Sequence, residues 1–384
     1  MNRPSALGRV ARAREGIDWA LLIGVLIIAV IGVINLYSAT SVAKAGRADL
    51  YVTQIYWLVA GGIAATLAAA IDYRHFERLA YVIYGGGIVL LLLVFILGRD
   101  IHGASRWIDI GGKERGFRFQ PSEFMKLILA ISLAKYLHDD PKIPAGPGGG
   151  GRRLGDYVVP AVLVGIPFAL VAKQPDLGTA LILMGIFVAV MALTRIRWQS
   201  LTLLVVGVTA TSLVAWNYLL HDYQKRRITS FINPELDIRG ANWHSHHARV
   251  AIGNGGVFGQ GYMHGTQNHY LFIPEQHTDF PFPVFAEDWG FTGGLVLIAA
   301  YTFVVLWGIG IAARARDRFG AALAVGVTAM IFWHAFFNIG MVTGVLPVVG
   351  VTLPLFSYGG SSVTTVLVGI GLLMNVSMRR NTFG

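Results

Sequence analysis

Residues 274–313 read PEQHTDFPFPVFAEDWGFTGGLVLIAAYTFVVLWGIGIAA, a polar stretch that runs directly into a long apolar one. From Val284 onward the apolar run is long enough to cross the roughly 30 Å hydrocarbon core of a bilayer as a helix. His277, Thr278 and Asp279 come just before it. A carboxylate in this place either caps the helix or does chemistry at the membrane surface. The rest of the chain decides between these readings.

Apolar runs of similar length recur along all 384 residues. The chain is 54% hydrophobic and 14% charged, and its mean hydropathy of +0.58 does not suit a soluble globule. We expect an all-α integral membrane protein with about ten transmembrane helices in a single polytopic domain, residues 1–384. The expected spans are approximately 18–38, 54–71, 79–98, 121–137, 157–173, 177–194, 199–219, 284–312, 319–343 and 357–378.

The distribution of Lys and Arg predicts the orientation of these spans. If residues 1–17 are a cytoplasmic N-terminus, every inside loop contains basic residues, and the C-terminus is cytoplasmic too. The Ala43–Ala45 stretch, AKA, resembles a signal-peptide cleavage site. Cleavage is nevertheless disfavoured, because the apolar stretch before it is longer than the usual ~7–15 residues. The absence of cysteine excludes disulfides, thiolate catalysis and Cys-based metal sites.

Two long connections interrupt the apolar pattern. Residues 138–156 include the Gly/Pro-rich PKIPAGPGGGGRR and read as a flexible cytoplasmic linker. Residues 220–283 form a long extracytoplasmic loop between the seventh and eighth spans, and a loop of this length usually has a function or short helices of its own. HARVAIGNGG is expected to form one such helix, ending at Gly253.

Charged residues stand at the start of the fourth span, in FQPSEFMKL. Pro121 suits the first helical position and Glu123 suits the positive end of the helix dipole, whereas Lys126 does not. The i,i+3 spacing puts Glu123 and Lys126 on one face, so we expect them to pair inside the membrane boundary. Either this is an ordinary helix start with a counter-ion, or the pair faces a polar cavity.

Other polar motifs fall at the same predicted face. Arg106 in GASRWIDIGG is either an interfacial anchor or a phosphate or sugar contact. Lys173 and Asp176 in KQPDLGTA belong either to ordinary turn chemistry or to a site. LFSYGGSS, before the last span, offers backbone N–H groups that could bind an anion at a helix N-terminus. HSHHA has no usual metal-ligand spacing. Because these segments converge on one membrane face, an outward-facing polar cleft is expected there.

Four motifs together resemble one known family, the RodA/FtsW (SEDS) proteins of bacterial cell-wall synthesis. They are GASRWIDIG…QPSEFMK, KQPDLGTAL, AIGNGGVFGQGYMHGTQ…FIPEQHTDF and NIGMVTGVLPVVGVTLPLFSYGGSS. The resemblance covers nearly the whole chain, and the 220–283 loop is more similar to the RodA, elongation branch. Departures include Pro281 and Pro283, which would shift the start of the eighth helix, and His247-Ala248, where a Gln-Ser pair is common. Thr352 and Phe356 also replace commoner residues.

The resemblance implies a ten-helix peptidoglycan glycosyltransferase in the bacterial inner membrane, with its active site facing outside. It would polymerise lipid II into a lipid-linked glycan, with undecaprenyl diphosphate leaving, and work with a class B penicillin-binding protein and the elongation machinery, without nucleic acid. Asp279 would be the catalytic base. The resemblance places Glu123, Lys126 and Asp176 in the family's cavity. The full expected substrate-binding set adds the motif residues Arg106, Lys173, His277, Thr278, Ser357, Gly359, Gly360 and Ser361.

Cofactors and alternative functions stay open on the sequence. No protein metal site is expected, but Mg²⁺ or Mn²⁺ bound through diphosphate oxygens would assist the leaving group. A lipid II flippase would need polar residues through the full membrane depth, whereas here they gather at the outer end. A non-catalytic scaffold for a transpeptidase would not need Asp279.

Overall fold

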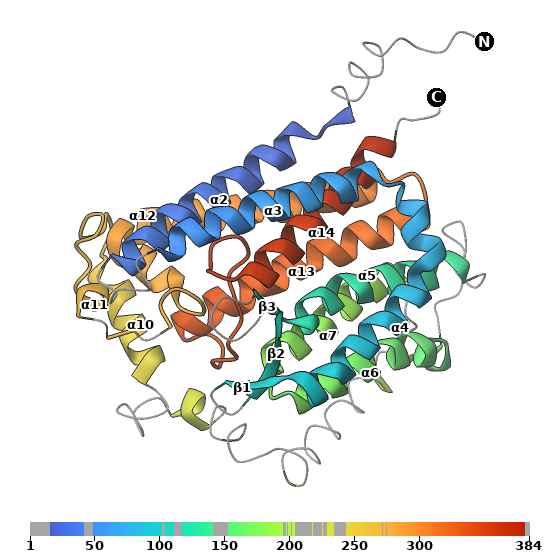
Figure 1. Cartoon of the computed structure of the whole chain (residues 1–384), viewed down its shortest axis with the longest axis horizontal. Coiled ribbons are helices and arrows are strands. Elements are labelled where there is room, and N and C mark those ends of the chain that lie inside the picture. The colour runs from blue at the N-terminus through green and yellow to red at the C-terminus, as the bar shows by residue number, and fades with distance from the viewer. Residues whose placement is uncertain are drawn as a thin grey trace.

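The computed structural model of this chain is a bundle of long helices with a small sheet and short helices at one end (Figure 1). The residues it describes are 16–41, 49–101, 104–110, 117–140, 153–194, 197, 199–200, 202–203, 217, 225, 229–233, 243–270, 272–273 and 275–380.

Seven helical stretches are long and apolar enough to cross a membrane, so this is a multi-pass membrane protein. They are α2 (Trp19–Thr40), α3 (Leu50–Ala70), α4 (Tyr73–Leu97), η1 with α6 (Leu154–Tyr157 and Val158–Lys173), α12 (Pro281–Ala313), α13 (Arg318–Thr343) and α14 (Gly360–Arg379).

Two further helices, α5 (Pro121–Asp139) and α7 (Leu177–Met191), pack among these seven. Every one of the nine coincides with a predicted span. The tenth predicted span, 199–219, lies mostly outside the described residues, so the count of ten stays a prediction.

Helices α13 and α14 form the interior of the bundle, whereas α3 and α4 expose most of their surface. Helix α14 packs closely along α3 at two glycines. A Cβ on Gly371 would lie 2.3 Å from the carbonyl oxygen of Ala65, and one on Gly61 would lie 2.6 Å from Leu367. Membrane helices commonly associate at small residues, which let the backbones approach closely. Close packing is important there because the hydrophobic effect does not favour helix–helix contact within lipid.

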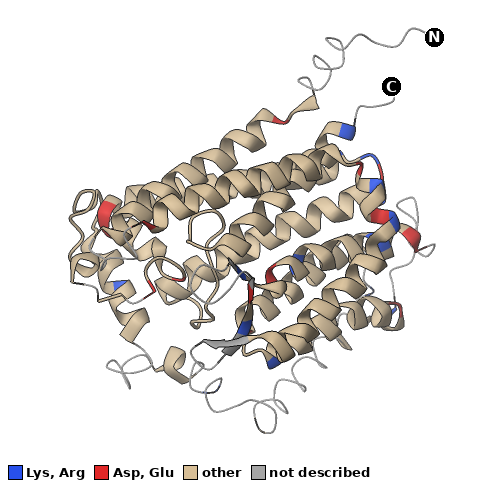
Figure 2. Ribbon diagram, viewed as in Figure 1, with Lys and Arg blue, Asp and Glu red and all other residues tan. Residues whose placement is uncertain are grey.

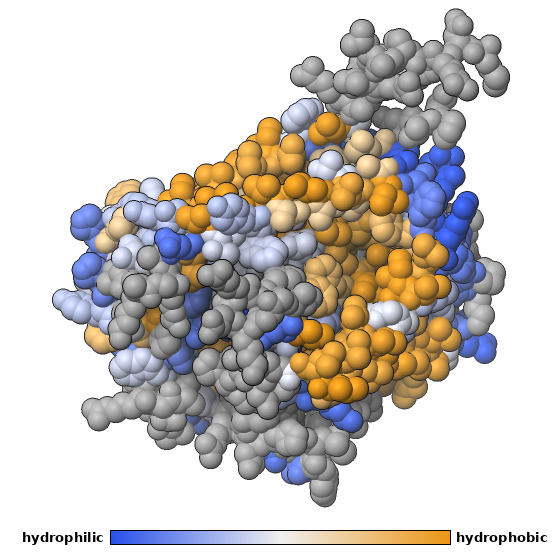
Figure 3. All heavy atoms as spheres, in the orientation of Figure 1, coloured by the Kyte–Doolittle hydropathy of each residue, from blue (hydrophilic) through white to orange (hydrophobic). Residues whose placement is uncertain are grey.

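The surface separates into an apolar belt and two polar ends. Figure 3 shows the belt in orange over the long helices, between bluer ends. We call the end that carries the sheet, α10 (Trp243–Asn254) and α11 (Thr266–His269) the loop face, and the end beside both termini the terminal face (Figure 1).

A small antiparallel sheet on the loop face departs from the all-α prediction. Its strands β1 (Arg99–Ile101), β2 (Ala104–Ile110) and β3 (Phe117–Phe119) are arranged in chain order. Ile108 lies opposite Phe119 in the β2–β3 pair, which brings the chain into α5 directly after the sheet.

Helix α12 starts earlier than predicted and is broken near its beginning. Pro281 occupies the first turn, which tolerates proline because its missing N–H would have no partner there. At Gly290 the backbone leaves helical geometry, with φ 69° and ψ −165°. The loop that follows α10 supplies the missing partners: the Phe291 N–H donates to the carbonyl of Gly256, and the Thr292 N–H to that of Val257. Irregular backbone at membrane depth is tolerated where protein satisfies it in this way.

Candidate functional site

The site is built around the segment that joins α13 to α14, residues 345–359, which we call the crossing segment. It has no regular secondary structure, and side chains from other helices hold its backbone in place. The Tyr301 hydroxyl donates to the carbonyl of Pro354 at 2.6 Å, and the Gln54 amide donates to that of Ser357 at 3.0 Å. These bonds hold the segment among the helices beneath the loop face.

Lys126 is fully buried and has two polar partners. Its ammonium lies 2.8 Å from Oε1 of Glu123, so the pairing predicted from the i,i+3 spacing is present. It also lies 2.6 Å from Nε2 of His334 on α13. The other ring nitrogen of His334, Nδ1, is 3.0 Å from the carbonyl oxygen of Thr352.

These contacts fix the tautomer of His334. A carbonyl oxygen only accepts hydrogen bonds, so Nδ1 must carry a proton and donate to Thr352. Lys126 has only donors, so Nε2 must accept from it. The imidazole is therefore neutral, and Glu123 is the counter-ion of the buried ammonium. Oε2 of Glu123 is buried without a hydrogen-bond partner, which leaves one carboxylate oxygen to receive a further donor.

Asp176 is the centre of a second buried polar group. Its Oδ2 accepts from the amide of Gln120 at 3.0 Å and from the hydroxyl of Ser122 at 3.3 Å, and its Oδ1 caps α7 by accepting from the Thr179 N–H at 3.3 Å. The same carboxylate thus joins the start of α5 to the start of α7. The structure therefore shows the turn role of Asp176, and its role in a substrate site stays a prediction.

Arg106 fastens the turn that precedes Asp176. From strand β2 its guanidinium donates to the carbonyls of Gln174, at 3.0 Å, and Pro175, and Nη1 lies 3.9 Å from Oδ1 of Asp176. Its side chain is 27% exposed. Arg106 therefore holds the α6–α7 turn while part of its side chain remains accessible.

Asp279 does not cap α12. The capping position is Phe280, and it makes no side-chain cap bond. Asp279 is half-buried, and a Cβ added to Gly350 of the crossing segment would lie 3.3 Å from its Oδ2. With the capping reading removed, the carboxylate stands beside the crossing segment on the loop face.

One face of α13 joins Asp279 to the Lys126 group. His334 and Asn338 are one turn apart and hold adjacent residues of the crossing segment. The Asn338 amide donates to the carbonyl of Val351 at 2.7 Å and to that of Asp279 at 2.9 Å. Gly178, at the start of α7, packs against the same stretch, where a Cβ would lie 2.9 Å from the carbonyl oxygen of Val349. Segments that are distant in sequence therefore meet at the crossing segment, whereas the outward-facing polar cleft stays a prediction.

The turn before α14 brings in the last predicted group. Ser357 Oγ accepts from the Leu353 N–H at 2.7 Å, and Ser361 Oγ accepts from the Gln120 N–H at 3.2 Å. Gly359 is the N-cap of α14, and Gly360 packs so closely on Trp57 that a Cβ would lie 2.5 Å from the indole. The two serines are buried and hold the turn through these bonds, and the two glycines shape it; their role in substrate binding stays a prediction.

The remaining predicted residues are more peripheral. His277 accepts the Tyr358 N–H through its carbonyl at 2.8 Å, which ties the Asp279 loop to the start of α14. The Thr278 hydroxyl lies 3.3 Å from Oε2 of Glu275. Lys173 is exposed at the end of α6 and, within the described part of the chain, has no polar contact with the site.

Sequence reasoning missed two buried acids on α12. Glu287 is fully buried, and its Oε1 accepts from the Gln267 N–H at 3.0 Å and the Thr266 hydroxyl at 3.1 Å. Asp288 accepts from the hydroxyl of Ser38 through its Oδ2. Glu287 therefore holds α11 against the broken start of α12, and Asp288 joins the same start to α2. Two adjacent acids inside an apolar run were a visible signal for them.

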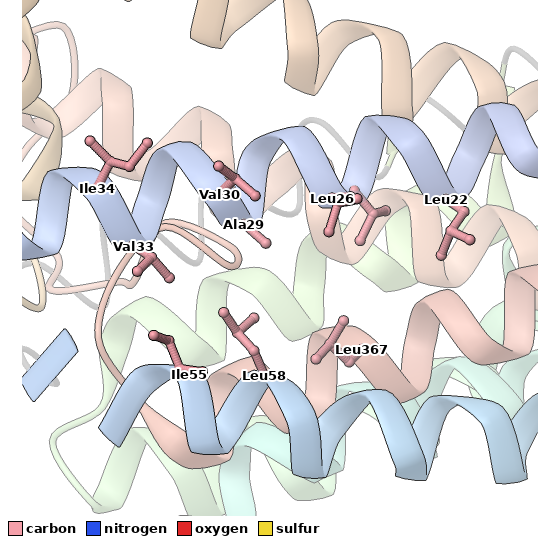
Figure 4. A pocket seen from close by; sticks show the side chains of 10 residues that line it. Leu22, Leu26, Ala29, Val30, Val33, Ile34, Ile55, Leu58 and Leu367 are labelled. Atoms are coloured by element: carbon pink, nitrogen blue, oxygen red, sulfur yellow. The ribbon is translucent and has the colours of Figure 1, made fainter. Parts of the chain in front are cut away.

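An apolar groove opens on the belt between α2, α3 and α14. It encloses about 420 Å³. Figure 4 shows its lining from α2, with Ile55 and Leu58 of α3 and Leu367 of α14. Ile55 follows Gln54, which bonds Ser357 and the Gly359 N–H. One end of the groove is therefore next to the turn before α14.

A trio of possible metal ligands lies at the terminal face and does not suit a metal. Glu77, His138 and Asp139 bring ligand atoms within 4.8 Å of one another. The ammonium of Lys135 already lies 3.3 Å from Glu77 and 2.8 Å from Asp139. A cation there would have to displace it, so the trio is better described as an ion-pair cluster.

Known proteins share both this sequence and this fold. Residues 18–382 match the FtsW/RodA/SpoVE family, described as "Cell cycle protein". The peptidoglycan glycosyltransferase MrdB of Escherichia coli K12 is 38% identical over 348 residues, 90% of each chain. The peptidoglycan glycosyltransferase RodA of Treponema pallidum is 32% identical, covering 96% of this chain and 99% of its own.

Solved structures agree with these sequence matches. A chain from a peptidoglycan synthase complex that coordinates polymerization and crosslinking superposes with a TM-score of 0.78 at 32% identity, covering 96% of this chain and 99% of that one. Thermus thermophilus RodA, a rod shape determining protein, superposes with a TM-score of 0.69 at 30% identity, covering 96% and 98%. The chain therefore belongs to the FtsW/RodA/SpoVE family.

Proposed function

We propose that this protein is a peptidoglycan glycosyltransferase of the RodA type that polymerises lipid II into glycan strands for cell-wall elongation. The observation that carries the proposal is the position of Asp279. It is a half-buried carboxylate on the loop face and is not the N-cap of α12. Its backbone carbonyl accepts from Asn338, one turn along α13 from His334, which contacts the buried ammonium of Lys126. Relatives of similar length are named for this activity.

In the proposed reaction a sugar hydroxyl attacks the anomeric carbon of a second, lipid-linked sugar. The new glycosidic C–O bond forms as the bond from that carbon to the diphosphate oxygen breaks, and the electron pair leaves with undecaprenyl diphosphate. Asp279 accepts the hydroxyl proton. A carboxylate partly shielded from water suits this task, because desolvation favours the protonated form.

Positive charge is needed where the diphosphate departs. Arg106, with its accessible edge, is the cation best placed on the loop face, whereas Lys173 is a surface charge at the end of α6. Lys126 is fully buried, so in this structure its ammonium contacts Glu123 and His334 and is not accessible to a diphosphate. Direct contact with the diphosphate would require the crossing segment to move.

A divalent cation is compatible with the loop face. A half-buried carboxylate such as Asp279 can contribute a ligand to a Mg²⁺ or Mn²⁺ held mainly by diphosphate oxygens. Such an ion would supply positive charge to the leaving group.

The membrane setting fits a substrate with a polyprenyl tail. The apolar groove opens to the lipid belt, and one end lies beside the turn before α14, so a tail can remain in the bilayer while the sugars reach the loop face. The helix ends at the terminal face carry many of the basic residues that the structure describes (Figure 2). This distribution supports a cytoplasmic terminal face and an active site facing outside.

A class B penicillin-binding protein is the proposed partner, within the elongation machinery. The structural neighbour in a peptidoglycan synthase complex, where polymerization and crosslinking are coordinated, supports this assignment. Crosslinking acts on the strands that polymerisation makes, so pairing the two activities shortens the path between them.

Polymerisation of purified lipid II by the purified protein, alone and with a transpeptidase partner, tests the function. We expect glycan ladders on gels from the unmodified chain and none from Asp279→Asn, which keeps the size and removes the base. Equal polymer from both proteins would disprove the role of Asp279. Activity that survives EDTA would assign this carboxylate to proton transfer without a metal.

A further inference from the structure

One group of side chains on the loop face has no part in the proposed reaction. Trp243 and His247, one turn apart on α10, pack with Phe272 and Tyr270 from the loop that leads to Asp279. The ring centroids are 4.1 Å apart for Trp243–His247, 5.1 Å for His247–Phe272 and 5.8 Å for Phe272–Tyr270. We call these four residues the aromatic cluster.

The cluster is held in a fixed arrangement. The indole N–H of Trp243 donates to the carbonyl of Phe272 at 3.0 Å, and Nδ1 of His247 lies 2.9 Å from Oε1 of Gln267. The His247 and Phe272 rings are within 19° of parallel. Rings that are already ordered lose little conformational entropy when a ligand binds them.

The cluster is nevertheless open to its surroundings. Tyr270 is 67% exposed and Phe272 37% exposed, while Trp243 and His247 are half-buried. Large aromatic surface left exposed together with polar ring atoms is typical of an interaction site.

The cluster lies beside the proposed base. His244, on the same turn of α10 as Trp243, stacks on Phe280, the residue after Asp279, with centroids 5.8 Å apart and planes 22° apart. The first turn of α10 therefore contacts the loop on both sides of Asp279, at Phe272 and at Phe280. Whatever binds the cluster is close to the reacting sugars.

The chemistry of the cluster suits a sugar. A pyranose ring has apolar C–H faces that stack on aromatic rings and hydroxyl edges that bond to imidazole, amide and phenol groups. A lipid surface is a poorer match, because a different patch is continuous with the apolar belt. Phe258, Trp289 and Phe291 are 82%, 43% and 68% exposed and lie on or against α12. Those three suit the membrane interface.

We propose that the aromatic cluster is a saccharide subsite that binds pyranose rings of the glycan strand next to Asp279. The identity of the strand rests on the proposed function, whereas binding of sugar rings does not. A subsite there retains the strand between additions, so it lengthens the polymer made per encounter.

Binding is tested on the full chain with Asp279→Asn, which prevents turnover. The probe is a lipid-free tetrasaccharide of alternating N-acetylglucosamine and N-acetylmuramic acid, titrated in micelles by calorimetry. We expect Tyr270→Ser, which removes the most exposed ring, to weaken binding by about threefold to tenfold. Phe258→Ser is the matched control, and its affinity should not change. Equal affinity for the tetrasaccharide in the Tyr270 and Phe258 variants overturns the proposal.

Strand length and lipid exposure provide independent tests. With Asp279 intact, Tyr270→Ser should give shorter strands than both the unmodified chain and Phe258→Ser, and strands of unchanged length overturn the subsite. The chain has no cysteine, so Tyr270→Cys carries a unique spin label. A label more accessible to oxygen than to an aqueous nickel chelate would mean membrane contact and overturn the proposal. If the protein makes no polymer but binds the tetrasaccharide, and Tyr270→Ser weakens that binding, the proposed function is wrong and the subsite stands.

Discussion

Replacing Lys126 with methionine should destabilise the protein more than most single substitutions. Methionine keeps an unbranched chain of similar length, so packing is largely retained while the charge is removed. Glu123 then loses its 2.8 Å partner, and its Oε2 is already without one. Removing one member of a buried ion pair costs about 3–5 kcal/mol, because the other charge is left uncompensated.

A double-mutant cycle with Glu123→Gln separates the ion pair from packing. Glu123→Gln also leaves an unmatched partner, since Lys126 keeps only the neutral His334. The double variant removes both charges, so its loss should be smaller than the sum of the two single losses by about 2–3 kcal/mol. Exchanging the two charges, with Lys at 123 and Glu at 126, should not restore stability. The carboxylate at residue 126 would then face Nε2 of His334, and both groups accept hydrogen bonds.

Unfolding by SDS in mixed micelles, followed by tryptophan fluorescence, measures these differences on a chain with nine tryptophans. Lys135→Met is the matched control, because it is the same substitution on the same helix. Lys135 pairs with Glu77 and Asp139 at the terminal face and is partly exposed, so about 1 kcal/mol or less is expected. Two results would refute a stabilising Glu123–Lys126 pair. One is a double variant whose loss in free energy of unfolding equals the sum of the single losses within about 0.5 kcal/mol. The other is an equal loss for Lys126→Met and Lys135→Met.

Variants at three further positions test the connections around Asp279. His334→Gln should keep most polymerase activity because its amide can both donate and accept, whereas His334→Leu should lose it; equal activity would show that the bonds to Lys126 and Thr352 are dispensable. Gly350→Ala puts a side chain at φ +70° and 3.3 Å from Oδ2 of Asp279, so we expect about 1 kcal/mol of strain and a reduced turnover rate, and an unchanged rate would separate the crossing segment from catalysis. Burial lowers the pKa of His244 from its ordinary value of 6.5, and the Glu275 carboxylate only partly opposes this. Because the unfolded chain then binds the proton more readily, the melting temperature should fall as the pH drops below about 6.5. The melting temperature of His244→Gln should fall less over the same pH range. Identical pH profiles for the two proteins would contradict a lowered pKa of His244 in the folded state.

The features that sequence predicted well are those decided by neighbours in the chain. The spans follow from apolar length, and the Glu123–Lys126 pair follows from i,i+3 spacing. The missed features depend on distant partners. The break at Gly290 is stable because the carbonyls of Gly256 and Val257 lie beside it, and no local pattern shows that pairing. The strands of the 99–119 sheet likewise become strands only when they pair with one another.

The same distinction explains how the site is coupled. His334 and Asn338 look like isolated polar residues in an apolar helix, and sequence gives no reason to connect them with Lys126 or Asp279. In the fold they are one turn apart on α13 and bond to adjacent carbonyls of the crossing segment. A shift of that segment would disturb the Lys126 contact through Thr352 and the Asp279 contact through Val351 together. Because an interior helix fixes both bonds, the proposed base and the buried ammonium cannot be repositioned independently.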